Sequence, residues 1–154
     1  MKVQIIAAGK IKDRWLKDGI SDYAKRLGKF FDLEIIEVPD ASDDAQIERA
    51  KKIESESLLA KVKNNSFLLA LDVAGKSLSS IELAEKLPLW LERGGANLTV
   101  LIAGSNGFSD DLLTKCDYRL SMSKMTFTHQ MARLIFLEQL YRAVKINRNE
   151  RYHK

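Results

Sequence analysis

A tyrosine-histidine pair lies in a basic tail at the end of the sequence. Tyr152 and His153 follow Arg148 and Arg151, and Arg142 lies ten residues before the tyrosine. Such side chains can position a planar ring by hydrogen bonding and stabilise charge that develops on it. A polar chain end is also typical of a frayed terminus, so the tail alone leaves both interpretations open.

A second group of candidate residues follows the apolar run at 98–103. Gly104 and Gly107 flank Ser105 and Asn106, and glycines permit positive φ angles and a close approach of the backbone to a ligand. The Asn106-Gly107 pair is equally typical of a simple turn. The segment therefore indicates either a turn or a binding loop, and its spacing is not that of a dinucleotide fingerprint.

Gly75, Lys76 and Ser77 match the last three positions of a phosphate-binding loop. Such a loop needs another glycine five positions before its second one, where this chain has Ala70 inside an apolar run. We therefore exclude a phosphate loop and predict a turn that leads into the next helix.

The few histidines and the single cysteine of the chain bear on metal binding and on its location in the cell. The two histidines, His129 and His153, do not pair with Cys116 or with carboxylates at metal-ligand spacing, so we expect no metal. A single cysteine cannot form an internal disulfide, which fits a reducing compartment. No signal peptide or membrane span is expected, since no apolar run approaches the required length. We predict a cytoplasmic protein.

Basic residues gather at both ends of the chain, whose formal net charge is +4. Positions 1–29 carry eight Lys and Arg against three Asp, and positions 142–154 carry five basic residues against one Glu. The middle of the chain is consequently acidic. If the ends lie together in the fold, they form a surface that attracts nucleic-acid phosphates. Two solvated helix faces without a partner are the alternative interpretation.

Strand-like and helix-like segments alternate along the whole chain, which predicts an α/β fold with a mostly parallel sheet and helices on both faces. One domain over 1–154 is the economical interpretation. In such sheets ligands bind beyond the carboxyl ends of the strands. We expect strands at 3–8, 33–38, 67–71, 98–103 and 118–122, and helices at 13–27, 43–62, 79–93, 109–115 and 128–147.

Apolar spacing predicts which helix faces are buried. The helix at 13–27 places Trp15 on its apolar stripe, and the helix at 43–62 does so with Ile47 and Ile53. Pro88 should weaken or kink its helix. The last helix is apolar nearly all round, so it needs cover on more than one side, from the same chain or from a partner subunit.

Taken together, several motifs resemble one family, the ribosomal RNA large subunit methyltransferase H family of the SPOUT class. The resemblance spans the chain from end to end, and motifs in the right order are more specific than any single one. They are the stretches at 1–10, 34–39, 104–107, 121–127, 129–133, 138–143 and 152–154.

The resemblance implies a deep trefoil α/β knot in the C-terminal half, an obligate homodimer and S-adenosyl-L-methionine (SAM) as cofactor. It implies N3 methylation of pseudouridine 1915 in 23S rRNA, in helix 69, on assembled 70S ribosomes. It assigns the target base to Arg142, Tyr152 and His153, with the tail reaching the partner's cofactor. The implied cofactor residues are Leu71, Ala103, Gly104, Met122, Ser123, Lys124, Met125, Thr126 and Phe127.

Three other functions stay open at this stage. The chain could methylate another RNA such as tRNA, or bind ribosomes without catalysis. A flavodoxin-like nucleotide binder is disfavoured, because positions 9–13 make a poor phosphate loop after the first predicted strand.

Overall fold

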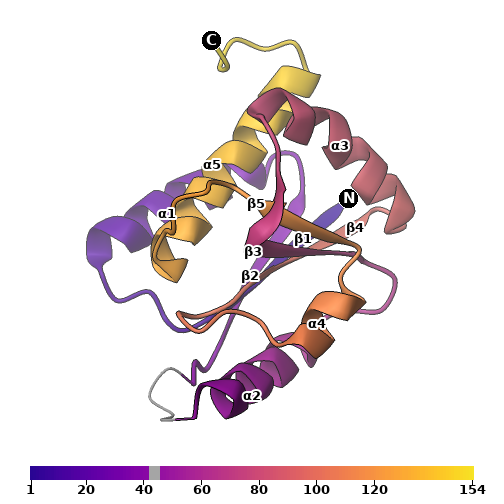
Figure 1. Ribbon diagram of the computed structural model, residues 1–154. Coiled ribbons are helices and arrows are strands. Elements are labelled where there is room, and N and C mark those ends of the chain that lie inside the picture. Colours follow the sequence, from indigo (N-terminus) through magenta and orange to yellow (C-terminus); the bar gives the residue numbers. More distant parts are fainter. Residues whose placement is uncertain (42–45) are drawn as a thin grey trace.

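The computed structural model describes residues 1–41 and 46–154, which form five strands and five helices (Figure 1). The strands are β1 (Lys2–Ala8), β2 (Asp32–Val38), β3 (Phe67–Ser77), β4 (Asn97–Ile102) and β5 (Tyr118–Ser121). The helices are α1 (Arg14–Leu27), α2 (Ile47–Leu59), α3 (Ser80–Arg93), α4 (Asp110–Lys115) and α5 (His129–Asn147).

The strands form one sheet in the order β2-β1-β4-β3-β5, and all four neighbouring pairs are parallel. Helices α1, α3 and α5 cover one face, and α2 and α4 cover the other (Figure 1). The predicted α/β class is therefore confirmed. All strands point the same way, so their carboxyl ends share one edge of the sheet.

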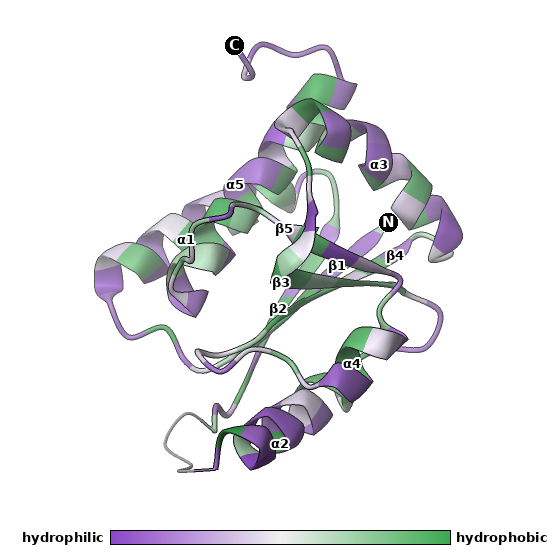
Figure 2. Cartoon of the chain, viewed as in Figure 1, coloured by the Kyte–Doolittle hydropathy of each residue, from purple (hydrophilic) through white to green (hydrophobic). Residues whose placement is uncertain are grey.

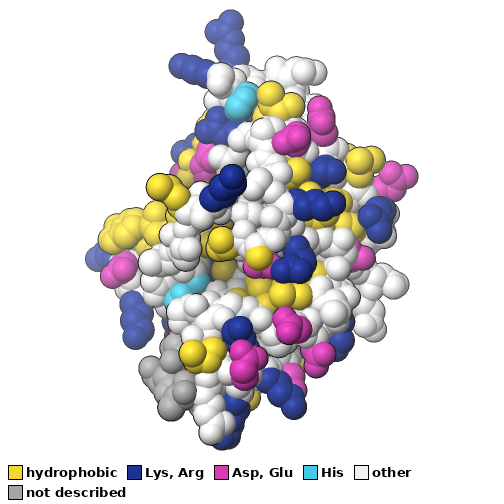
Figure 3. Space-filling view, viewed as in Figure 1, with side chains coloured by type: hydrophobic (Ala, Val, Ile, Leu, Met, Phe, Trp, Pro, Cys, Tyr) yellow, Lys and Arg dark blue, Asp and Glu magenta, His cyan; other side chains and the backbone are white. Residues whose placement is uncertain are grey.

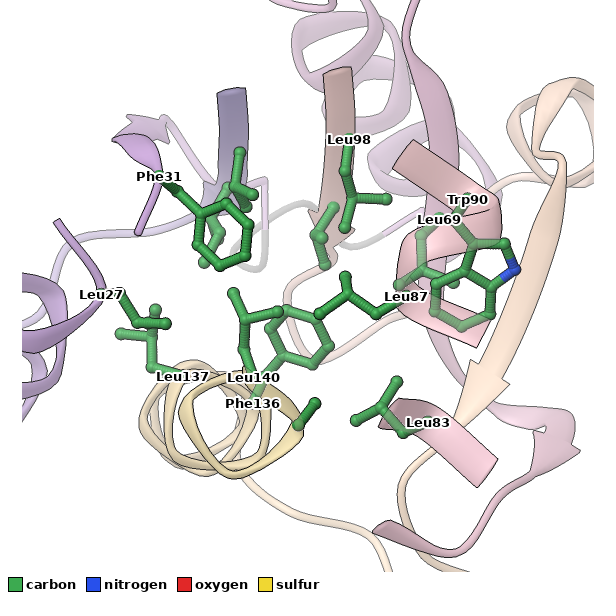
Figure 4. Packing of buried hydrophobic residues seen from close by; sticks show 14 of the residues in the cluster. Leu27, Phe31, Leu69, Leu83, Leu87, Trp90, Leu98, Phe136, Leu137 and Leu140 are labelled. Carbon is green, nitrogen blue, oxygen red and sulfur yellow. The ribbon is translucent and has the colours of Figure 1, made fainter. Parts of the chain in front are cut away.

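Two apolar clusters hold the helices on the sheet. The larger joins β1, β3 and β4 to α3 and α5, where Leu87, Phe136 and Leu140 pack together (Figure 4). The smaller lies under α2 and α4 on the opposite face, around Leu58 and Leu112. Hydrophobic residues fill the central strands, while hydrophilic ones mark the outer side of α2 (Figure 2), as expected for a sheet buried on both faces.

The structure corrects two predicted elements. Strand β3 continues to Ser77, so Gly75, Lys76 and Ser77 form a strand rather than the predicted turn, and they pair with β5 after a register shift. This extension lacks an apolar signature, since most of its residues beyond Asp72 are exposed. Helix α2 ends at Leu59 instead of 62, and the predicted start at 43–45 lies outside the described residues.

Three residues that the spacing placed on buried stripes are exposed. Trp15 is 61% exposed, and Ile47 and Ile53 of α2 are 56% and 42% exposed. Leu16, the neighbour of Trp15, is buried instead. Adjacent helical residues point about 100° apart, and the buried side of α1 includes Leu16 but not Trp15. The tryptophan is thus left on a face of α1 with no cover from the described chain.

Helix α3 contains Pro88 yet continues without interruption to Arg93. Proline has no N–H to donate to the carbonyl four residues earlier, which is Ala84. The side chain of Asn147, the last residue of α5, donates to that Ala84 oxygen at 2.8 Å. This hydrogen bond therefore replaces the one that Pro88 cannot donate, and it connects α5 to α3.

The basic ends of the chain lie together, as the charge interpretation required. The Tyr23 hydroxyl of α1 lies 3.2 Å from that of Tyr152, and the Arg26 guanidinium lies over the Tyr141 ring. Figure 3 shows basic side chains around the C-terminal end of the molecule. This arrangement brings part of both positive segments to one end of the α1–α5 pair.

Replacing Asn147 with alanine should destabilise the fold, because the buried Ala84 carbonyl loses its donor. We expect a loss of about 1–2 kcal/mol in the free energy of unfolding, measured by urea denaturation at fixed protein concentration. Asn64→Ala, in an exposed loop, is the control and should change little. Equal stability of the Asn147 and Asn64 variants would contradict this role.

Candidate functional site

A cavity of roughly 670 Å³ opens beside the middle of β3 and at the carboxyl ends of β4 and β5. Three segments line it: 71–73 within β3, 102–108 after β4, and the stretch from β5 into the first turn of α5. Its walls are largely apolar, with a few polar groups, which is the usual character of small-molecule sites of this size. The cavity therefore lies where the sequence placed a ligand.

Eight of the nine predicted cofactor residues line this one cavity, and Lys124 does not. The structure gathers them from three separate elements, so their convergence is not a consequence of sequence proximity. The eight are Leu71, Ala103, Gly104, Met122, Ser123, Met125, Thr126 and Phe127.

The segment after β4 is both a turn and part of the cavity wall. The Gly107 N–H donates to the Gly104 oxygen at 3.1 Å, and Gly107 has a φ of +81°, which favours glycine. The Gly104 N–H donates to Glu54 of α2 at 2.6 Å. This amide is therefore already bonded within the chain, while Gly104 itself remains part of the cavity lining.

Two cavity residues were missed by the sequence interpretation. Asp72 is the only carboxylate among the lining residues, and Arg119 donates to it twice, at 2.6 and 2.9 Å. Burial, together with the charge of nearby Arg133, lowers the pKa of His129, so its ring is neutral at pH 7. The motif at 129–133 contained His129, but spacing alone gave it no role.

At the carboxyl end of β1, a side chain of α5 occupies the space in which a ligand could bind. Ligands of parallel sheets usually bind where the strand order reverses, which here lies between β1 and β4. Arg133, with 2% of its side chain exposed, donates to the carbonyls of Ala8 and Gly9 at 2.7 and 2.6 Å and pairs with Glu37. The arginine occupies the end of β1 and confines the cavity to β3, β4 and β5.

The predicted catalytic residues form a cluster of their own. The Arg142 guanidinium lies over the Tyr152 ring at 4.9 Å and 3.4 Å from the His153 Nδ1. Glu138 accepts hydrogen bonds from Arg142 at 2.6 Å and from Tyr152 at 3.1 Å. Glu138 was not singled out from the sequence, although its spacing of four from Arg142 is that of a helical ion pair.

Tyr152 is held in its protonated form. Burial and the hydrogen bonds with Tyr23 and Glu138 raise the pKa of its phenol above the ordinary value. The Tyr152 hydroxyl donates a hydrogen bond to the Glu138 carboxylate, so the Tyr23 hydroxyl is the donor to the Tyr152 oxygen. At neutral pH this group can therefore act as a hydrogen-bonding and stacking group, and not as a base.

Within one chain, the cavity and the tail cluster are far apart. Ala132 is the last cavity residue on α5, and Arg142 lies ten residues further along the same helix. At about 1.5 Å per residue this is roughly 15 Å along the axis. The cofactor residues and the catalytic residues therefore form two separate groups.

Among residues 1–41 and 46–154, no helix is both long and apolar enough to cross a membrane. In the same ranges, no three His, Cys, Asp or Glu side chains gather as a set that could hold a metal ion.

Comparison with known proteins shows the family of the chain. Residues 1–153 match the family model described as a predicted SPOUT methyltransferase. The chain belongs to the SPOUT methyltransferase family. It is 47% identical to ribosomal RNA large subunit methyltransferase H of Clostridioides difficile and 45% identical to that of Ruminiclostridium cellulolyticum. Both matches cover all of this chain and all of the relative, which confirms the resemblance found in the sequence.

A solved structure of a probable methylase family protein from Haemophilus influenzae has the same fold, with a TM-score of 0.54 and 15% identity. The match covers 96% of this chain and 66% of that longer protein. It supports the α/β architecture of this SPOUT family member and nothing finer.

SAM, the methyl donor that the resemblance implies, fits the cavity by size and chemistry. Leu71, Met122 and Phe127 offer apolar surface for an adenine ring. Asp72 is the only carboxylate among the lining residues, and because Arg119 pairs with it, the wall carries little net charge beside its polar oxygens. The residues that would hold SAM are those of the three lining segments.

Filling the cavity should weaken cofactor binding. Thr126→Trp places an indole in the cavity from an exposed lining position and should weaken SAM binding about tenfold or more, measured by calorimetry. Lys124→Trp, two residues away and outside the lining, is the matched control and should leave affinity within about twofold. Equal losses in both variants would contradict the cavity as the binding site.

Proposed function

We propose that this chain is a SAM-dependent methyltransferase of large-subunit ribosomal RNA that modifies N3 of pseudouridine 1915 in 23S rRNA on 70S ribosomes. The observation that carries the proposal is the convergence of eight predicted cofactor residues on one cavity. The names of the two relatives, matched over their full lengths, supply the substrate class.

The chemistry divides between the two groups of residues. SAM, when bound, supplies a methyl group already activated on a sulfonium, so the protein has mainly to align donor and acceptor. The acceptor N3 carries a weakly acidic proton that must leave. Arg142 can stabilise the resulting negative charge, while Tyr152 and His153 bound the ring. No side chain is assigned as the base.

A homodimer would unite the two groups, with the tail of one protomer at the cavity of the other. Their separation along α5 supports this, because a single chain leaves the cavity without its catalytic residues. The exposed Trp15 and the half-exposed Leu134, Ile135 and Met131 supply apolar surface on α1 and α5 for a partner. Figure 3 shows hydrophobic side chains over that part of α1.

The basic ends of the chain would hold rRNA phosphates near the tail. Arg148 and Arg151 are exposed, and Lys145 and Arg26 stand beside aromatic rings at the same end. This placement combines cations with stacking surfaces, as RNA-binding sites do. A single domain over 1–154, a C-terminal knot and a cytoplasmic location complete the proposal by resemblance to the family.

The direct test is methyl transfer from labelled SAM to 70S ribosomes that lack this modification. We expect label on the large-subunit rRNA of 70S ribosomes, and little on separated subunits. Label on tRNA would keep the activity and replace the target. Absence of label despite SAM binding would contradict the proposed substrate and favour a ribosome-binding factor or another RNA.

The composite site predicts that two inactive variants restore each other. Arg142→Ala removes the catalytic cluster and Thr126→Trp fills the cavity, but a mixed dimer retains one intact pair. Equal co-expression should therefore restore about a quarter of wild-type activity, because half the dimers are mixed and each has one working site. Activity no higher than that of either variant alone would contradict a shared site.

A further inference from the structure

Helix α2 contacts the wall of the cavity through two consecutive buried side chains, Glu54 and Ser55, which are 4% and 2% exposed. Both are polar residues in a position where apolar ones would be expected. Burying a carboxylate and a hydroxyl is costly unless each is hydrogen-bonded. Their partners therefore indicate why these residue types occur here.

The partners are the two ends of the cavity segment at 104–109. The Glu54 Oε1 accepts from the Gly104 N–H at 2.6 Å, and the Ser55 Oγ accepts from the Ser109 N–H at 3.0 Å. The second oxygen of Glu54 accepts from the Ala41 N–H at 3.2 Å, beyond the end of β2. Three backbone donors that no strand or helix would satisfy are thus bonded by adjacent residues of α2.

Between these two anchors, the segment is shaped by one bond of its own, from Gly107 to Gly104. Phe108 is buried below it, in the smaller apolar cluster that also contains Leu58 of α2. The cavity wall contributed by 104–108 is consequently held by hydrogen bonds with α2, in addition to the packing of Phe108 on the strands. Neither Glu54 nor Ser55 lines the cavity, so they act on a ligand only through this segment.

We propose that Glu54 and Ser55 are positioning residues that hold the 104–109 segment in the shape that SAM requires. The inference rests on the proposed function, and it adds α2, an element without cavity-lining residues, to the cofactor site. Charge-assisted hydrogen bonds to a carboxylate are stronger than neutral ones, so Glu54 should matter more than Ser55.

Three variants and one control test the proposal by SAM calorimetry and steady-state kinetics. Glu54→Ala should weaken SAM binding about tenfold or more, and Ser55→Ala about threefold or more. Glu54→Gln keeps one acceptor for Gly104 and should lie between wild type and Glu54→Ala. Glu56→Ala, an exposed glutamate of the same helix, should leave affinity unchanged.

A positioning role raises the KM for SAM more than it lowers kcat, because the catalytic cluster on the tail is untouched. Hydrogen exchange should also accelerate at the Gly104 and Ser109 amides in the alanine variants. If Glu54→Ala fails to fold, Glu54→Gln and Ser55→Ala carry the test. Folded variants with wild-type SAM affinity would overturn this inference alone, whereas a wild-type chain that does not bind SAM would overturn the proposed function as well.

Discussion

The arrangement of both the cavity and the tail cluster depends on the hydrogen bonds made by the Arg133 guanidinium. This guanidinium is almost fully buried and bonds the carbonyls at the end of β1 and the Glu37 carboxylate. Helix α5 begins at the cavity and ends at the tail cluster, so this anchor fixes the position of both. A neutral replacement would leave the two carbonyls and the Glu37 carboxylate without this donor, which costs several kcal/mol.

Parallel strands impose the second constraint, because they bring their carboxyl ends to one edge. On β1 that edge is closed by Arg133, and beside β4 the Gly104 amide is bonded to Glu54. The remaining space lies over β3, β4 and β5, where apolar walls and Asp72 form the cavity. The site is therefore placed as much by what fills the neighbouring strand ends as by the residues that line it.

Much of this could be predicted from the sequence where local chemistry decides the outcome. Ser79 and Glu82 have the spacing of a capping box at the start of the helix expected at 79–93, and both of its hydrogen bonds are present. The apolar run at 98–103 predicted a buried strand, and the glycines after it a turn at the sheet edge. Family resemblance supplied the cofactor residues, eight of which lie together.

The rest depends on partners distant in sequence. The extension of β3 exists because β5 pairs with it, and no pattern within 72–77 indicates that pairing. Trp15 has the spacing of a core residue but lies on the uncovered side of α1. Glu54 and Ser55 have the sequence pattern of polar positions on a surface helix, and only their contacts with Gly104 and Ser109 distinguish them.

We propose that the cofactor residues and the catalytic residues come together only where two protomers are in contact. A crystal structure of the chain with SAM bound tests this most directly. We expect SAM in the cavity over β3, β4 and β5, with Arg142, Tyr152 and His153 of the other protomer facing its methyl group. SAM bound elsewhere, or a tail that reaches the cavity of its own chain, would contradict it.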